Sequence, residues 1–144
     1  MIAVDTNVLL RYLIAPADAR NPPWQARVAA ETINSADSVY LSDIVLAETE
    51  WVLETVFELT KAEIHSVLKQ LASNTRFIFE DWSALQSALM DYSETPKVDF
   101  SDCLIARRAT SKGTQTLYSF ESRKKLGALS IVTTLVNGKG ASWE

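Results

Sequence analysis

Short apolar runs alternate along the chain with longer segments in which apolar side chains recur every three or four residues. The short runs predict β-strands, and the longer amphipathic segments predict helices. The predicted strands cover residues 2–4, 38–41, 76–79, 114–118 and 130–133, and the predicted helices cover residues 6–14, 22–35, 43–57, 60–72, 83–94, 99–112 and 123–126. Because strands and helices alternate throughout, the pattern predicts an α/β protein.

Capping signals support the boundaries of these helices. A side chain that accepts a hydrogen bond from the first turn favours a helix start, and a glycine favours a helix end. The residues that carry these signals are Asp5 or Thr6, Ser42, the capping boxes Thr60-x-x-Glu63 and Ser83-x-x-Gln86, Asp99, and Gly113 at a helix end. The order of elements predicts a three-layer α/β/α sandwich with a mainly parallel central sheet.

Acidic residues follow two of the predicted strands directly. The strand at residues 2–4 ends in Asp5, and the strand at residues 114–118 is followed by Ser119, Phe120 and Glu121. Ligands of open parallel sheets bind outside the carboxyl ends of the strands, so Asp5 and Glu121 are expected on one rim. A carboxylate at the end of a buried strand needs a cap, a basic partner or a metal ion.

A third acid, Glu48, lies within the helix predicted for residues 43–57. Helical spacing places it on one face with apolar residues, which predicts that it points toward the core: Ile44, Ala47, Trp51 and Val52. The remaining glutamates of this segment follow a separate spacing and are expected to face solvent: Glu50, Glu54 and Glu58. A glutamate on the core side of a helix needs a partner.

Asp102 completes a candidate metal site of four acids. It lies in the first turn predicted after Asp99, where an acid also interacts favourably with the helix dipole. Carboxylates gathered at one rim repel one another unless a hard divalent cation neutralises them. Oxygen ligands without a supporting histidine or cysteine cluster favour Mg²⁺ or Mn²⁺, and such a site suits hydrolysis of phosphodiesters.

Four features, in their order and spacing, resemble a PIN domain. They are Asp5-Thr6-Asn7, the glutamate about 40 residues later, Asp-Phe-Ser-Asp-Cys-Leu-Ile-Ala at residues 99–106 and Thr-Leu-Tyr-Ser-Phe-Glu at residues 116–121. The resemblance is closest to the toxin subunit of VapBC-type toxin–antitoxin systems. It implies that Asp5, Glu48 and Asp102 bind the metal. The fourth acid of the family lies in Thr-x-Asp, which Ser119-Phe120-Glu121 matches with a longer side chain, so Glu121 is expected to act directly or through water.

The same resemblance assigns further residues and partners. Asp99 matches a position that often carries an additional acid, and Asn7 and Ser119 match polar positions that orient the acids or the scissile phosphate. The family implies a single-strand RNA endonuclease that uses Mg²⁺ or Mn²⁺, forms a homodimer and is inhibited by a small antitoxin. A free-standing RNA-processing nuclease and a non-catalytic protein-binding module stay open as alternatives.

Composition adds a charge asymmetry to this picture. The chain of 144 residues is 47% hydrophobic, which is enough for one domain over residues 1–144, with residues 138–144 as a tail that is poorly ordered or used for contacts. Residues 1–96 hold 6 basic against 14 acidic residues, and residues 97–144 hold 8 against 4. The basic residues Arg107, Arg108 and Lys124 are candidates to contact an RNA backbone.

Two absences in the sequence bear on location. No stretch is long and apolar enough to span a bilayer, and the N-terminal run lacks the features of a signal peptide. The single cysteine, Cys103, cannot form an intrachain disulfide and is expected to be a small buried side chain. A cytoplasmic protein is the expectation.

Overall fold

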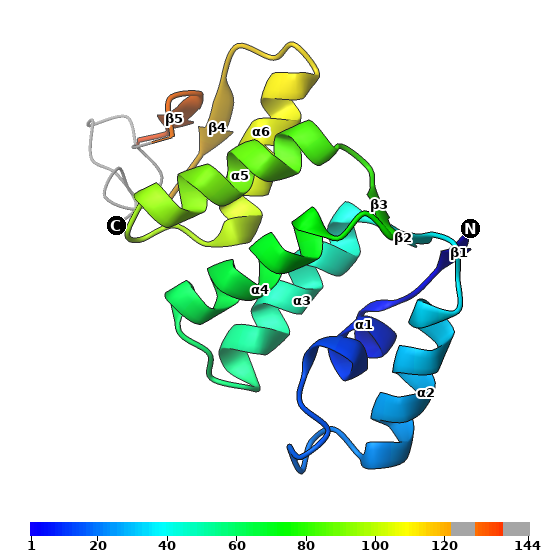
Figure 1. Cartoon of the computed structure of the whole chain (residues 1–144). Coiled ribbons are helices and arrows are strands. Elements are labelled where there is room, and N and C mark those ends of the chain that lie inside the picture. Colours follow the sequence, from blue (N-terminus) through cyan, green and yellow to red (C-terminus); the bar gives the residue numbers. More distant parts are fainter. Residues whose placement is uncertain (122–128, 137–144) are drawn as a thin grey trace. The chain divides into compact units, whose positions relative to one another are not determined.

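The computed structural model describes residues 1–121 and 129–136 (Figure 1). The chain divides into two compact units, Met1–Glu80 and Asp81–Glu144, and each is described by itself. The short basic helix predicted for residues 123–126, the candidate Lys124 and the predicted tail at residues 138–144 lie outside the described residues.

Unit 1 contains a parallel sheet of three strands, β1 (Ile2–Ala3), β2 (Val39–Leu41) and β3 (Phe77–Phe79), in the order β1-β2-β3. Four helices connect or follow these strands: α1 (Thr6–Leu13), α2 (Pro23–Asn34), α3 (Asp43–Thr55) and α4 (Lys61–Ser73). Val39 pairs with Ile2 on one side and with Phe77 on the other. All three strands therefore run the same way, and their carboxyl ends meet at one edge.

Helices carry most of the apolar core of unit 1. Helix α1 packs beside α2 (Figure 1) and also contacts α3, which in turn contacts α4. The most deeply buried side chains come from all four helices and from β2: Leu9, Ile33, Val39, Leu41, Leu46, Leu53, Ile64 and Leu68. The apolar stripes of the helices thus form most of this core.

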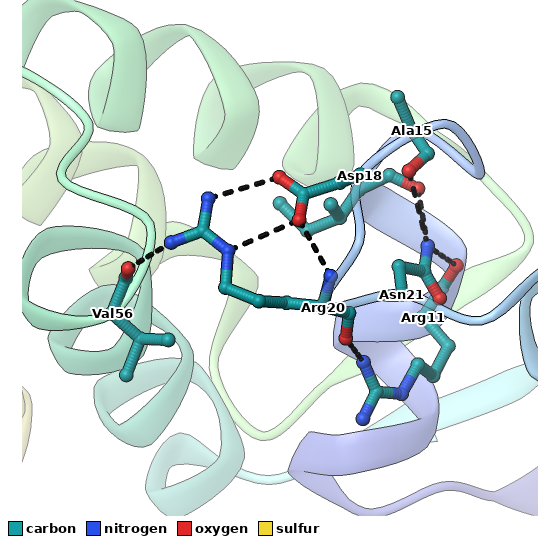
Figure 2. A network of polar contacts seen from close by, with 7 residues as sticks. Arg11, Ala15, Asp18, Arg20, Asn21 and Val56 are labelled. Carbon is teal, nitrogen blue, oxygen red and sulfur yellow. Dashed lines mark hydrogen bonds and ion pairs between the residues drawn. The ribbon is translucent and has the colours of Figure 1, made fainter.

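The loop between α1 and α2 is fixed by Arg20 (Figure 2). Its guanidinium forms two hydrogen bonds of 3.0 Å with the Asp18 carboxylate and also donates to the backbone carbonyl of Val56 after α3. The same group lies over the ring of Phe57, 4.4 Å from the ring centroid, which is a cation–π arrangement. The Arg20 hydrogen bond lowers the pKa of Asp18.

Asn21 joins the same loop to the end of α1 (Figure 2). This fully buried side chain donates through Nδ2 to the carbonyls of Ile14 at 2.8 Å and Arg11 at 3.2 Å, which are among the acceptors that a helix end leaves without a helical partner. The side chain of Arg11 in turn donates to the backbone carbonyl of Arg20. The loop and the last turn of α1 therefore hold each other in place.

Unit 2 contains α5 (Trp82–Glu94), α6 (Phe100–Ser111) and the parallel strand pair β4 (Leu117–Ser119) and β5 (Val132–Thr134). Helices α5 and α6 pack side by side (Figure 1), with Tyr92 and Phe100 in edge-to-face contact at a centroid distance of 6.2 Å. Cys103 is fully buried, as predicted. Gly113, at φ 82°, follows the end of α6 in the left-handed conformation that glycine adopts readily.

The parallel strands and the alternation of elements confirm the predicted α/β class. The predicted N-caps Ser42 and Thr60 are confirmed, the latter in a full capping box with Glu63. The predicted start of α5 at Ser83 is wrong, because Asp81 accepts a hydrogen bond of 2.8 Å from Ala84 N–H and the helix begins at Trp82. Strand β4 begins at Leu117 rather than at residue 114. Among the described residues, no helix is long and apolar enough to cross a membrane.

The start of α5 gives a direct test of helix capping. Asp81→Ala removes both the cap and the ion pair with Arg108 and is expected to lower the thermal unfolding midpoint by several degrees, whereas Asp81→Asn keeps a capping oxygen and should lose less. Ser83→Ala should leave the midpoint nearly unchanged. The hydrogen bond from Ala84 N–H holds the pKa of Asp81 below its ordinary value of 3.8. A carboxyl with a depressed folded-state pKa stabilises the fold above its ordinary pKa and loses that contribution as the pH falls. The difference in unfolding midpoint between wild type and Asp81→Ala, measured by thermal melts, should therefore shrink below about pH 4. A difference that stays constant with pH would mean that the ionised Asp81 carboxylate does not cap α5.

Candidate active site

Asp5 lies at the junction of β1 and α1. Its backbone is extended, and its Oδ1 accepts a hydrogen bond of 3.0 Å from Val8 N–H, so Asp5 is the N-cap of α1 as predicted. The side chain is exposed, and β1 is exposed as well. The expectation of a carboxylate at the end of a buried strand is therefore wrong, and the capping bond supplies the partner that the sequence calls for.

Glu48 is brought to the same end of unit 1 by a single side-chain contact. Thr6 Oγ1 donates a hydrogen bond of 3.2 Å to Glu48 Oε1, which joins the first turn of α1 to the middle of α3. Thr6 follows Asp5 directly in the chain. Asp5 and Glu48, which are 43 positions apart in the sequence, are thus linked through one threonine.

The predicted orientation of α3 is wrong. Glu48 is exposed, and its neighbours Ile44 and Trp51 are 71% and 62% exposed. The buried face of α3 consists of Leu46, Thr49, Glu50 and Leu53. The buried face and the exposed face of α3 both have apolar residues at helical spacing and one glutamate each. The apolar pattern of the sequence therefore does not show which face points to the core.

Two polar residues on the buried face of α3 explain why the sequence was misleading. Thr49 is fully buried but satisfies its hydroxyl by donating to the Val45 carbonyl at 2.7 Å. Glu50 is only 3% exposed and has an interaction partner, contrary to its predicted position in solvent. Glu54 and Glu58 are exposed, as predicted.

The acids of unit 2 lie at the start of α6 and after β4. Asp102 Oδ2 accepts a hydrogen bond of 3.2 Å from Asp99 N–H, which completes a capping box. The predicted N-cap role of Asp99 and the first-turn position of Asp102 are confirmed. Ser119 Oγ accepts a hydrogen bond of 3.0 Å from Glu121 N–H. Asp102, Ser119 and Glu121 line one pocket of about 200 Å³.

The family follows from a comparison of the whole sequence. The PIN domain family model matches residues 2–127, which covers unit 1 from Ile2 onward and unit 2 up to residue 127. The chain belongs to the PIN domain family. This match and the parallel strands confirm the predicted PIN-like α/β/α fold class. A comparison with curated proteins finds no match.

PIN domains are generally metal-dependent nucleases, and the acids of unit 1 fit that chemistry. Asp5 and Glu48 each accept one hydrogen bond through one carboxylate oxygen, from Val8 N–H and from Thr6 Oγ1. Within the described part of the chain, the second oxygen of each makes no hydrogen bond. Exposed carboxylate oxygens are the donors that Mg²⁺ and Mn²⁺ prefer. The donor set of this PIN domain therefore suits a hard divalent cation.

The basic candidates of unit 2 are engaged in ion pairs with neighbouring acids. Arg107 binds the Asp91 carboxylate through two nitrogens at 2.6 and 2.9 Å, and this hydrogen bonding raises the pKa of Arg107. Arg108 NH1 donates to Asp81 Oδ2 at 3.0 Å. Each ion pair offsets the positive charge with which the arginine would attract an RNA backbone. Because Asp81 caps α5 and Asp91 lies within it, the two pairs also hold α6 against α5.

Thr6 is the site residue that sequence reasoning missed. A threonine in the first turn of a helix has an ordinary structural use, and only the fold places α3 beside it. Asn7, which was predicted to support the acids, is exposed and lines a groove together with Asp5. The signal in the sequence that could have found Thr6 is the predicted strand at residues 2–4, since Asp5, Thr6 and Asn7 follow it directly.

The two glutamates of α3 make a matched pair for a stability test. Glu50→Ala removes a buried, partnered group and should lower the free energy of unfolding by about 1 to 3 kcal/mol. Glu48→Ala changes an exposed side chain and should cost less than about 0.5 kcal/mol. Urea unfolding followed by circular dichroism measures both, and equal losses would mean that the two faces of α3 are assigned wrongly.

Proposed function

We propose that this PIN domain is a metal-dependent endoribonuclease that hydrolyses phosphodiester bonds in single-stranded RNA. The observation that supports the proposal is the Thr6 to Glu48 hydrogen bond, which links Glu48 to the residue directly after Asp5 in a chain of this family. The proposed cofactor is Mg²⁺ or Mn²⁺. The proposed ligands are Asp5, Glu48 and Asp102, joined directly or through water by Glu121 and Asp99.

The divalent ion would polarise a phosphoryl oxygen and promote attack by water. The chain's own residues supply position. The N-cap bond orients Asp5, Thr6 orients Glu48, and the capping box orients Asp102. Ser119 holds the backbone of Glu121. Each of these four acids thus has at least one hydrogen bond on its side chain or backbone that limits its motion, which favours a preorganised site.

We further propose that the protein is the toxin of a toxin–antitoxin pair, that it acts in the cytoplasm, and that it forms a homodimer bound by a cognate antitoxin. The support is the resemblance of Asp5-Thr6-Asn7 and of residues 99–106 to VapC-type toxins. A free-standing RNA-processing nuclease would share the metal site and lack the antitoxin. A non-catalytic binding module would lack metal affinity.

Metal binding and cleavage test the proposed activity together. The purified protein should bind Mn²⁺ in a calorimetric titration and cleave single-stranded RNA, and EDTA should abolish cleavage. Asp5→Asn and Glu48→Gln should each lower cleavage at least about 100-fold, because each removes a charged ligand. Glu31→Gln, at an exposed glutamate of α2, is the control and should retain full activity. Cleavage that persists in EDTA would refute the proposal.

Thr6 should act on Mn²⁺ affinity through Glu48. Thr6→Val keeps the shape of the side chain but removes the hydroxyl, and loss of a group that orients a ligand costs roughly 10-fold in metal affinity. Thr6→Ser retains the hydroxyl and should bind Mn²⁺ nearly as well as wild type. If both variants lose affinity equally, the hydrogen bond has no part in orienting Glu48. Thermal melts control for a general loss of stability.

A further inference from the structure

A groove of about 540 Å³ runs from the candidate site of unit 1 between α1 and α2. Asp5 and Asn7 line it at the carboxyl end of β1, Arg11 lines it further along α1, and Trp24 and Val28 line it from α2. These two helices pack directly against each other, so the groove belongs to a well-packed part of the unit. The proposed catalytic acid Asp5 is therefore part of the groove wall.

The α2 side of the groove is an exposed apolar surface. Trp24 is 59% exposed and Val28 is 45% exposed, and the two lie one helical turn apart. Gln25 and Thr32 add polar groups to the same wall. An exposed indole beside hydrogen-bonding side chains is the arrangement on which nucleobases stack.

The α1 side of the groove carries a fixed positive charge. The guanidinium of Arg11 donates to the Arg20 carbonyl, within the network that holds the loop between α1 and α2 (Figure 2). Within residues 1–121 and 129–136, Arg11 forms no ion pair, and its Nε is buried without a hydrogen-bond partner. In contrast to Arg107 and Arg108, this arginine keeps an uncompensated charge.

We propose that this groove binds a nucleotide of the single-stranded RNA substrate next to the scissile phosphate. The base stacks on the Trp24 indole, and the Arg11 guanidinium faces a backbone phosphate. The inference rests on the proposed function, because it takes Asp5 as the point where the strand is cut. A cation and an aromatic side chain facing one groove match a single strand, which offers phosphates and bases in alternation.

Binding without cleavage tests the groove separately from the chemistry. The full chain is titrated into a fluorescein-labelled single-stranded oligouridine in EDTA, with fluorescence anisotropy as the readout. Trp24→Ala should raise the Kd about 10-fold, since loss of base stacking on an aromatic side chain costs that much, and Trp24→Phe should retain most of the affinity. Trp82→Ala removes an indole of 57% exposure from α5 and should bind like wild type.

The outcomes separate the groove from the proposed function. If wild type cleaves RNA with Mn²⁺ but Trp24→Ala binds the oligouridine as tightly as wild type, the groove is not the RNA path and the inference is overturned. A groove that holds a protein segment would give this result. If the Kd rises as expected while no metal-dependent cleavage is found, the groove stands and the proposed function fails. Absence of any oligouridine binding by wild type overturns the inference.

Discussion

The hydrogen bond that ends β1 and begins α1 is the constraint on which the rest of unit 1 depends. A parallel strand must pass into a helix within one or two residues, and the first turn of that helix has N–H groups without partners. Asp5 satisfies one of them through Oδ1, and Ser42 does the same after β2 through its bond to Val45 N–H. After β3, Glu80 accepts a hydrogen bond from Asp43 N–H. Oxygen-bearing side chains therefore collect at the carboxyl edge for structural reasons alone.

This structural demand explains how the proposed metal site can form from exposed acids without buried charge. A capping carboxylate uses one oxygen for the helix and keeps the other for solvent or a cation, as at Asp5. In unit 2, Asp102 also combines a capping role with a place at a pocket, because it accepts a hydrogen bond from Asp99 N–H and lines the pocket with Glu121.

The features of the fold that depend on neighbouring residues can be predicted from the sequence, whereas those that depend on contacts between distant elements cannot. The capping box at Thr60, the cap at Ser42 and the left-handed glycine after α6 depend on a few adjacent residues, so the sequence specifies them. Ser83 was chosen wrongly because Asp81, two residues earlier, is an equally good cap and its position is decided by Ala84 N–H. The face of α3 depends on which side α1 and α4 cover, and no window of sequence around Glu48 contains that information.

The misjudged face changes the reason for assigning Glu48 but not the assignment. From the sequence, Glu48 was a candidate because a core position gives a glutamate no ordinary use. In the structure Glu48 is exposed. Its proposed role as a metal ligand now depends on Thr6, which donates a hydrogen bond to Glu48 Oε1 from the helix that Asp5 caps. An exposed glutamate without such a bond samples several rotamers, and ordering it around a cation costs conformational entropy. In the proposed metal site, the Thr6 hydrogen bond would remove part of that entropic cost before the cation binds, because it already restricts the Glu48 side chain.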